Sequence, residues 1–87
     1  MYAVFLEKRV FKDLAYFPSK HVRQIKERCE NLSKDPLPPG SEKLSGVEGP
    51  KYRVRQGPYR VIYTIDHSQK IGRIEHVAQR KEVHRNL

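Results

Sequence analysis

The segment Lys51-Tyr52-Arg53-Val54-Arg55-Gln56-Gly57-Pro58-Tyr59-Arg60-Val61-Ile62-Tyr63 alternates apolar and cationic side chains on both sides of Gly57-Pro58. Alternation with a period of two residues is typical of strands that have one buried and one solvent-exposed face. The Gly-Pro pair between two such runs indicates a tight turn. We therefore predict a β-hairpin with a two-residue turn of type II′, in which Gly57 supplies a positive φ angle.

This turn fixes the register of the hairpin. Three pairs of residues are expected to lie opposite each other: Gln56 and Tyr59, Arg55 and Arg60, and Arg53 and Ile62. One face then carries the apolar side chains of Tyr52, Val54, Val61, Tyr63 and Ile65. The other face carries Arg53, Arg55, Arg60 and Thr64. A shift of one residue would place Val54 among the arginines, so the apolar pattern itself selects this pairing.

The arginine face predicts an anionic partner. Arg53 and Arg55 lie about 7 Å apart along a strand that rises roughly 3.3 Å per residue, with Arg60 beside them. No Asp or Glu occurs between Lys51 and Ile65. Like charges opposed across strands destabilise a hairpin, and a solvated face usually mixes both signs. The alternative is that the arginines only keep one face of the sheet in water.

Composition indicates one small basic domain. The 87 residues suffice for a single domain, residues 1–87, with one sheet covered on one side. Hydrophobic residues make up 37% and charged residues 32%, which is the composition of a folded chain. The net charge of +8 predicts a polyanion or an acidic protein as partner.

Cysteine content and hydropathy indicate a cytoplasmic protein without a membrane partner. The single cysteine, Cys29, forms neither an internal disulfide nor a cysteine metal site, as is common in a reducing compartment. The longest apolar run, Tyr2 to Leu6, is too short to span a membrane, and no signal segment precedes it.

The N-terminal part predicts a strand followed by two helices. Met1 to Glu7 reads as a strand that is buried on both sides and interior to the sheet. A short helix follows from Arg9 and ends before Pro18, with apolar residues at helical spacing: Val10, Leu14 and Phe17. Ser19 is the expected N-cap of a second helix. The apolar stripe of that helix is Val22, Ile25, Cys29 and Leu32.

The C-terminal part predicts three antiparallel strands. Lys34 to Pro50 holds four prolines and is expected to be an irregular loop, pinned by Lys43-Leu44. The hairpin follows, and then a strand from Lys70 to about Ala78. The apolar residues of that strand, Ile71, Ile74 and Val77, are spaced by three, which indicates a bulge. The basic segment from Gln79 to Leu87 is expected to dock on the sheet through Val83 and Leu87, which are four residues apart, as one helical turn.

These elements predict an α+β fold. The expected architecture is a small, twisted, mainly antiparallel four-stranded sheet with two N-terminal helices packed on one face, in the order strand, helix, helix, strand, strand, strand. The arginines occupy the other face.

The sequence offers no metal or cofactor site. The histidines are scattered at positions 21, 67, 76 and 84, and no glycine pattern matches a nucleotide loop. Asp13, Asp35 and Asp66 each read as a cap, loop or turn residue. What remains is a set of arginines, aromatic rings and histidines.

Such a set suits metal-independent RNA cleavage. The 2′-hydroxyl of the substrate attacks the adjacent phosphorus, guanidinium groups stabilise the phosphoryl oxygens, and an acid protonates the leaving 5′ oxygen. Histidine is the natural proton-transfer group near neutral pH. We select His84, beside Arg80 in the C-terminal segment. The alternative is an exposed histidine near a chain end.

Three segments resemble the RelE/ParE superfamily of bacterial and archaeal toxins. The segment 52–63 resembles its central hairpin, and the segment 77–85 resembles its closing motif of glycine, histidine, arginine, a charged step, valine and tyrosine. Lys43-Leu44-Ser45-Gly46 matches a loop of the family. In the RelE branch this resemblance implies a toxin that cuts messenger RNA in the ribosomal A site and is restrained by an antitoxin.

The resemblance also assigns roles to individual residues. The implied catalytic residues are Arg53, Arg55, Arg60, Arg80 and His84. Arg53 and Arg55 stand where relatives often carry lysines, and His84 replaces the tyrosine of the closing motif. Gln79 stands where histidine is common. We expect further contacts with RNA from Lys51, Gln79, Lys81 and Arg85.

Three hypotheses follow. The first is a ribosome-dependent mRNA endoribonuclease without a cofactor. The second is a ParE-type toxin that inhibits DNA gyrase by binding it, and the third is an RNA-binding module without activity. Both toxin hypotheses imply an acidic, partly disordered antitoxin that folds over the basic domain.

Overall fold

The computed structural model describes residues 1–44 and 50–79 of the chain. Within these ranges the elements follow the order strand, two helices, four strands. The bounds are β1 Ala3–Leu6, α1 Lys8–Leu14, α2 Ser19–Asn31, β2 Glu42–Lys43, β3 Lys51–Gln56, β4 Tyr59–Asp66 and β5 Ile71–Gln79. This order confirms the predicted α+β class, with one strand more than expected.

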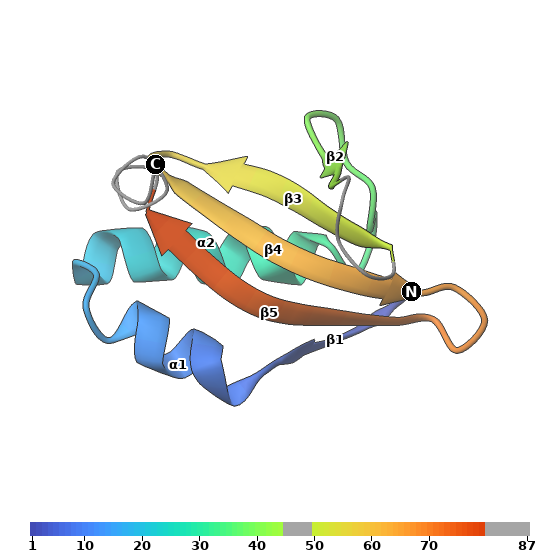
Figure 1. The fold of residues 1–87 in the computed structure, drawn as a ribbon, viewed down its shortest axis with the longest axis horizontal. Helices are drawn as coiled ribbons and strands as arrows, with labels where there is room; N and C mark the ends of the chain where they lie inside the picture. Colours follow the sequence, from blue (N-terminus) through green and yellow to red (C-terminus); the bar gives the residue numbers. More distant parts are fainter. Residues whose placement is uncertain (45–49, 80–87) are drawn as a thin grey trace.

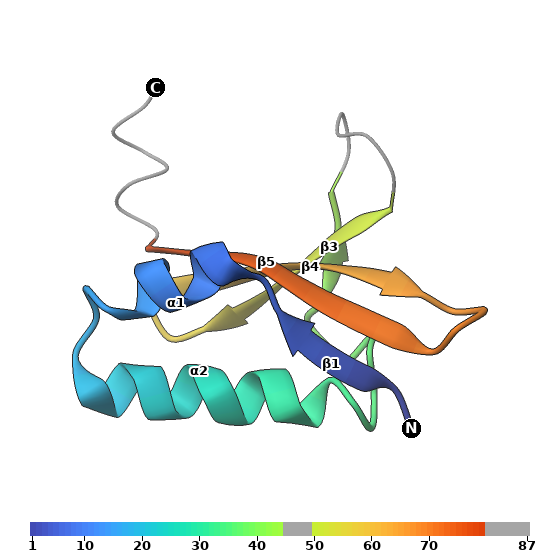
Figure 2. The same cartoon turned by 90° about the horizontal axis from the view of Figure 1, so that it is seen from below.

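The strands form one sheet in the order β1-β5-β4-β3-β2. β1 pairs with β5 in parallel, and all other neighbours are antiparallel. Helix α2 lies against one face of the sheet, whereas α1 continues from the end of β1 and runs beside β5 (Figures 1 and 2). In the part of the chain that the structure describes, the other face carries no such helix over β3 and β4.

The hairpin of β3 and β4 has the predicted register. Arg55 lies opposite Arg60 and Arg53 opposite Ile62, and Gly57 in the turn has a φ of 59°. Val54, Val61, Tyr63 and Ile65 are buried, as the alternation predicted. The apolar pattern therefore determined which face of the hairpin turns toward α2.

The core lies between the sheet and the helices. It contains Val10 and Leu14 from α1, Ile25 and Cys29 from α2, Leu32, and the buried residues of β3, β4 and β5. The predicted stripe of the second helix is confirmed, with Val22 only partly buried. Phe17 lies beyond the end of α1 and packs on Tyr59, with their ring centroids 4.4 Å apart.

Several local predictions were wrong. β1 is an edge strand and not an interior one: Val4 and Leu6 are half-buried while Ala3 and Phe5 are exposed, so only one side is covered. The N-cap of α2 is Pro18 and not Ser19. The carbonyl of Pro18 accepts the first helical bond, from the Val22 N–H at 3.0 Å.

The loop between α2 and β3 contains a strand that was not predicted. Glu42 and Lys43 form β2 and pair with Arg53 and Tyr52 of β3. The Leu44 N–H extends this pairing by donating to the Lys51 carbonyl at 2.8 Å. The predicted pin at Lys43-Leu44 is thus confirmed, but it acts through the backbone and adds a fifth strand.

The predicted bulge in β5 is confirmed. Ile62 pairs with His76 and Tyr63 pairs with Ile74, so Glu75 is an extra residue on β5. The bulge keeps Ile74 and Val77 on the buried side although they are three residues apart. The docking predicted for Val83 and Leu87 lies outside the described residues. None of the helices within the described ranges is long and apolar enough to span a membrane.

Candidate nucleic-acid interface

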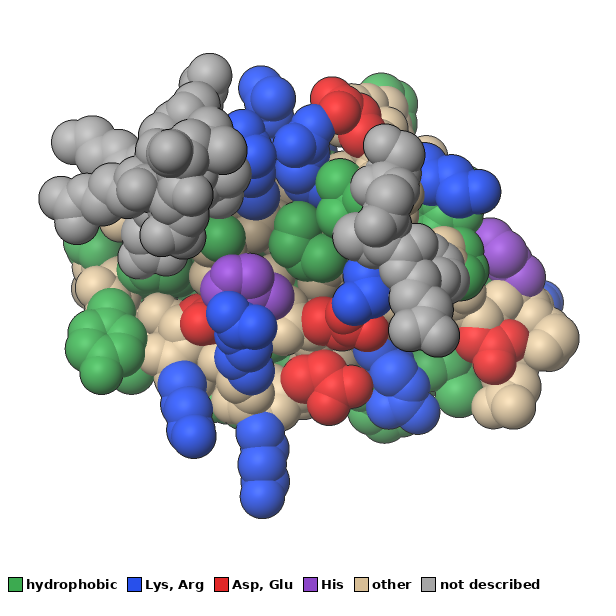
Figure 3. Space-filling view, in the orientation of Figure 1, with side chains coloured by type: hydrophobic (Ala, Val, Ile, Leu, Met, Phe, Trp, Pro, Cys, Tyr) green, Lys and Arg blue, Asp and Glu red, His purple; other side chains and the backbone are tan. Residues whose placement is uncertain are grey.

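The face of the sheet opposite α2 gathers the basic side chains of the hairpin. We call it the cationic face and define it by Lys51, Arg53, Arg55 and Arg60. Their strands lie next to each other, so the register sorts these residues into rows that cross the sheet. The space-filling view shows Lys and Arg side chains grouped on this face beside acidic and histidine side chains (Figure 3).

The first row holds the strongest concentration of positive charge. Arg55 of β3 lies opposite Arg60 of β4, which in turn lies opposite the buried Ala78 of β5. Arg55 is exposed and Arg60 is half-buried. Within residues 1–44 and 50–79, Arg55 has no carboxylate partner. Opposed residues on one face have Cβ atoms about 5 Å apart, so both guanidinium groups can reach one phosphate.

The second row contains Arg53 and the third row contains Lys51. Each of these two cations contacts an acidic side chain that the sequence did not predict. Arg53 forms an ion pair with Glu42 of β2, which lies directly opposite it. The Nζ atom of Lys51 lies 2.8 Å from Oε1 of Glu75, the bulged residue of β5. The expectation of a face without acids was therefore wrong, because neighbouring strands supply the carboxylates that the hairpin itself lacks.

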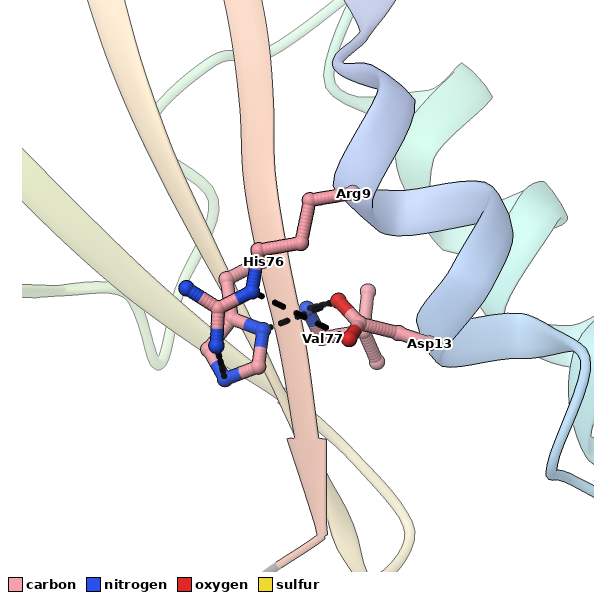
Figure 4. Close-up of polar contacts among 4 residues, drawn as sticks. All are labelled: Arg9, Asp13, His76 and Val77. Carbon is pink, nitrogen blue, oxygen red and sulfur yellow. Dashed lines mark hydrogen bonds and ion pairs between the residues drawn. The ribbon is translucent and has the colours of Figure 1, made fainter.

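The second row ends in a histidine that sequence reasoning did not select. His76 lies opposite Ile62, and its Nδ1 atom is 2.8 Å from Oδ2 of Asp13 in α1. Asp13 was expected to cap a helix or sit in a loop, and this was wrong. Instead its Oδ2 atom also accepts a hydrogen bond from the Val77 N–H at 3.0 Å (Figure 4). No local sequence signal connects positions 63 or 64 residues apart.

The other two aspartates behave as predicted. Asp66 accepts hydrogen bonds from Ser68 and from the Gln69 N–H, and these bonds lower the pKa of its carboxyl group. Asp35 accepts the Leu37 N–H at 3.2 Å. Both residues stabilise turns away from the cationic face.

Two ionisable groups lie in the core beneath the face. Burial raises the pKa of Tyr63 to about 12, and its hydroxyl donates to the Pro36 carbonyl at 2.7 Å. Burial also raises the pKa of the Cys29 thiol to about 11, with the charge of Glu30 adding to the effect. Both groups are therefore neutral at physiological pH, and their roles are structural.

Of the remaining predicted residues, the structure describes Gln79 alone. Gln79 pairs with Tyr59, whose ring packs against Phe17 and His21 on the helix side. Arg80, Lys81, His84 and Arg85 lie outside the described residues. Among residues 1–44 and 50–79, no three His, Cys, Asp or Glu side chains converge as a metal site would require.

The α+β fold of this chain matches that of solved RelE structures. A family model described as the ParE toxin of type II toxin–antitoxin systems, parDE, matches residues 4–84. The chain therefore belongs to this toxin family.

Relatives of the chain carry RelE names. A toxin named RelE1 from Methanocaldococcus jannaschii is 31% identical over 83 residues, which cover 93% of this chain and 92% of the relative. The archaeal RelE–RelB complex from Pyrococcus horikoshii contains a chain that is 34% identical, with a TM-score of 0.80 and coverage of 91% and 94%. The RelBE2 toxin–antitoxin complex from Mycobacterium tuberculosis gives 26% identity, a TM-score of 0.81 and coverage of 91% of both chains.

Proposed function

We propose that this toxin is a ribosome-dependent mRNA endoribonuclease that inhibits translation. The observation that carries the proposal is the opposed pair Arg55 and Arg60 on the cationic face, with Arg53 two residues from Arg55 on the same strand. Guanidinium groups bind phosphate oxygens in pairs and stabilise the charge that develops on them. The RelE names of the relatives support the same choice.

The proposed reaction needs no metal ion. The 2′-hydroxyl of the messenger attacks the adjacent phosphorus and displaces the 5′ oxygen of the next nucleotide. Arg53, Arg55, Arg60 and Arg80 bind and stabilise the scissile phosphate, and His84 transfers a proton as general acid or base. Lys51, Gln79, Lys81 and Arg85 hold the flanking RNA. The cytoplasm is the compartment in which such a toxin meets ribosomes.

Programmed ribosomes provide the decisive test. The wild-type protein should cut messenger RNA in the A site, and Arg60→Ala should lower the rate by about 10²-fold to 10³-fold, the usual cost of losing one preorganised charge donor. Arg80→Ala should have a similar effect. Arg23→Ala serves as the control because Arg23 is an exposed cation on α2, away from the cationic face. Circular dichroism should be unchanged in all three variants. Intact messenger after incubation with the wild-type protein would refute the proposal.

A second candidate function is inhibition of DNA gyrase, and the match to the ParE toxin model favours it. A gyrase inhibitor of this type acts by binding and needs no proton-transfer group. A DNA supercoiling assay run beside the ribosome assay separates the two functions. Binding of RNA with a steep salt dependence but without cleavage would instead indicate an RNA-binding module.

We also propose an acidic antitoxin as the partner of this chain in the resting cell. The relatives of known structure from Pyrococcus and Mycobacterium were solved as toxin–antitoxin complexes. The net charge of +8 favours an acidic segment that becomes ordered on binding.

A further inference from the structure

His76 lies on the cationic face, on the strand next to Arg60. Its row on the sheet runs from Arg53 through Ile62 to His76. Arg60 precedes Ile62 by two residues on β4, so Arg60 and His76 are diagonal neighbours with Cβ atoms about 7–8 Å apart. The His76 side chain is 27% exposed. A phosphodiester held by Arg60 therefore lies within reach of the imidazole.

Helix α1 holds the imidazole in a fixed orientation (Figure 4). Asp13 Oδ2 lies 2.8 Å from His76 Nδ1, and Arg9 Nη2 lies 3.3 Å from His76 Nε2. Arg9 and Asp13 are one helical turn apart, and Arg9 Nε is 4.0 Å from Asp13 Oδ1. Both ring nitrogens of His76 thus have a partner on the same helix.

The chemical nature of these partners determines the tautomer. An ionised carboxylate only accepts hydrogen bonds, so His76 Nδ1 carries the proton that it donates to Asp13. A guanidinium group only donates, so Nε2 presents a lone pair to Arg9. These roles place the lone pair of the ring on Nε2, the nitrogen beside Arg9. This is the form that accepts a proton from a hydroxyl group.

We propose that His76 is the general base of the cleavage reaction and that Asp13 is its positioning residue, an inference that rests on the proposed nuclease function. His76 Nε2 takes the proton of the 2′-hydroxyl while the 2′ oxygen forms a bond to phosphorus. The bond from phosphorus to the 5′ oxygen breaks, and that oxygen takes a proton from a water molecule. The products are a 2′,3′-cyclic phosphate and a 5′-hydroxyl.

Arg9 does not prevent this role. Its side chain is 65% exposed, so it can leave the ring at little cost when a phosphate enters. Within residues 1–44 and 50–79, the other charged groups on this face include the ion pairs of Arg53 with Glu42 and of Lys51 with Glu75. Arg55, Arg60 and Arg73 also lie on it. Asp13 stabilises the imidazolium that forms when the base is protonated.

The link between α1 and β5 does not depend on the His76 side chain. Asp13 already ties α1 to β5 through the Val77 N–H, next to the bulge at Glu75. That hydrogen bond needs no side chain at position 76. The histidine is consequently available for chemistry, and its removal should leave the fold intact.

The test uses four variants of the full chain on programmed ribosomes. His76→Ala and His76→Gln should lower the cleavage rate by about 10²-fold to 10⁴-fold, the range of general acid–base catalysis. Added imidazole should restore part of the activity of His76→Ala but not that of His76→Gln, whose side chain fills the space. Asp13→Asn keeps an acceptor for the Val77 N–H but can present its amide to Nδ1, so it should also slow cleavage. His67→Gln is the matched control, because His67 lies in the turn between β4 and β5 and contacts Tyr2.

A second readout does not depend on activity. In the free protein, ¹⁵N NMR should show His76 protonated at Nδ1 and unprotonated at Nε2, and Asp13→Asn should change this pattern. Wild-type rates in both His76 variants, alongside an inactive Arg60→Ala, would overturn the base assignment and leave the proposed function intact. Loss of activity without imidazole rescue in a folded His76→Ala would also overturn it. A wild-type protein that cuts no messenger would refute both proposals together.

Discussion

At the scale of single residues, the core of this toxin keeps two weak acids neutral. Cys29 is 2% and Tyr63 1% exposed, and burial raises the pKa of the thiol to about 11 and that of the phenol to about 12. In the unfolded chain the same groups titrate near 9 and 10. A raised folded-state pKa contributes stability that is fully present below the unfolded value and is lost as the pH rises toward the folded value.

We therefore expect stability to fall in alkali, first from Cys29 between pH 9 and 11 and then from Tyr63 between pH 10 and 12. The urea midpoint measured from pH 7 to pH 11 should decline above pH 9. Cys29→Val replaces the thiol with an apolar group of similar size and should remove the earlier part of this decline. Parallel curves for the wild type and Cys29→Val would contradict the assignment.

Residue-level prediction from the sequence succeeded where a period repeats and failed where a contact is long-range. The arginines and the buried valines of the hairpin follow from alternation alone, since each residue's face depends only on its neighbours. Asp13 and His76 meet because α1 lies beside β5, and no local pattern records that packing. Likewise, Glu42 meets Arg53 and Glu75 meets Lys51 only in the assembled sheet.

At the scale of elements, strand β2 lowers the positive charge of the cationic face. Its Glu42 pairs with Arg53 and so reduces the positive charge that this row offers to a phosphate. Glu42→Gln should free Arg53, raise the affinity for single-stranded RNA and steepen the dependence of log K on log salt by about 0.7. Fluorescence anisotropy over a salt series measures this slope. Glu27→Gln, an identical change on the exposed face of α2, should leave the slope unchanged; equal changes in both variants would mean that only net charge matters.

The hairpin turn depends on the backbone of Gly57. A Cβ atom at this position would meet no other atom within 4 Å, yet φ is +59°. Gly57→Ala should therefore destabilise the domain by roughly 1–2 kcal/mol through the backbone alone, the cost of a left-handed conformation for an L-residue. Gly57→Asn should cost less, because asparagine tolerates this region. Equal urea midpoints for the wild type and Gly57→Ala would refute the argument.

Longer helices and strands were easier to predict from the sequence than shorter ones. The helices and the three longer C-terminal strands carry enough residues for a period to be visible, and the bulge appeared as a break in that period. β2 has two residues, too few for any periodicity. β1 was assigned to the interior because nearly all of its residues are apolar, but Phe5 is 51% exposed beside Arg73, whose guanidinium lies 5.8 Å from its ring centre.

At the scale of the whole molecule, the net charge of +8 and the toxin fold lead to one prediction in cells. Induced expression of the wild-type chain should stop growth, and incorporation of labelled methionine should fall before that of labelled thymidine. Arg60→Ala should permit growth at the same protein level. Co-expression of an acidic antitoxin should restore growth and yield a stable complex. An earlier fall in thymidine incorporation would instead indicate gyrase as the target.

The parallel pairing of β1 with β5 joins the first strand of the chain to the last strand described. The sheet is incomplete without β5, because β5 pairs with both β1 and β4 and also supplies the Val77 N–H that Asp13 binds. The five-stranded sheet of a nascent chain is consequently incomplete until β5 has been synthesised.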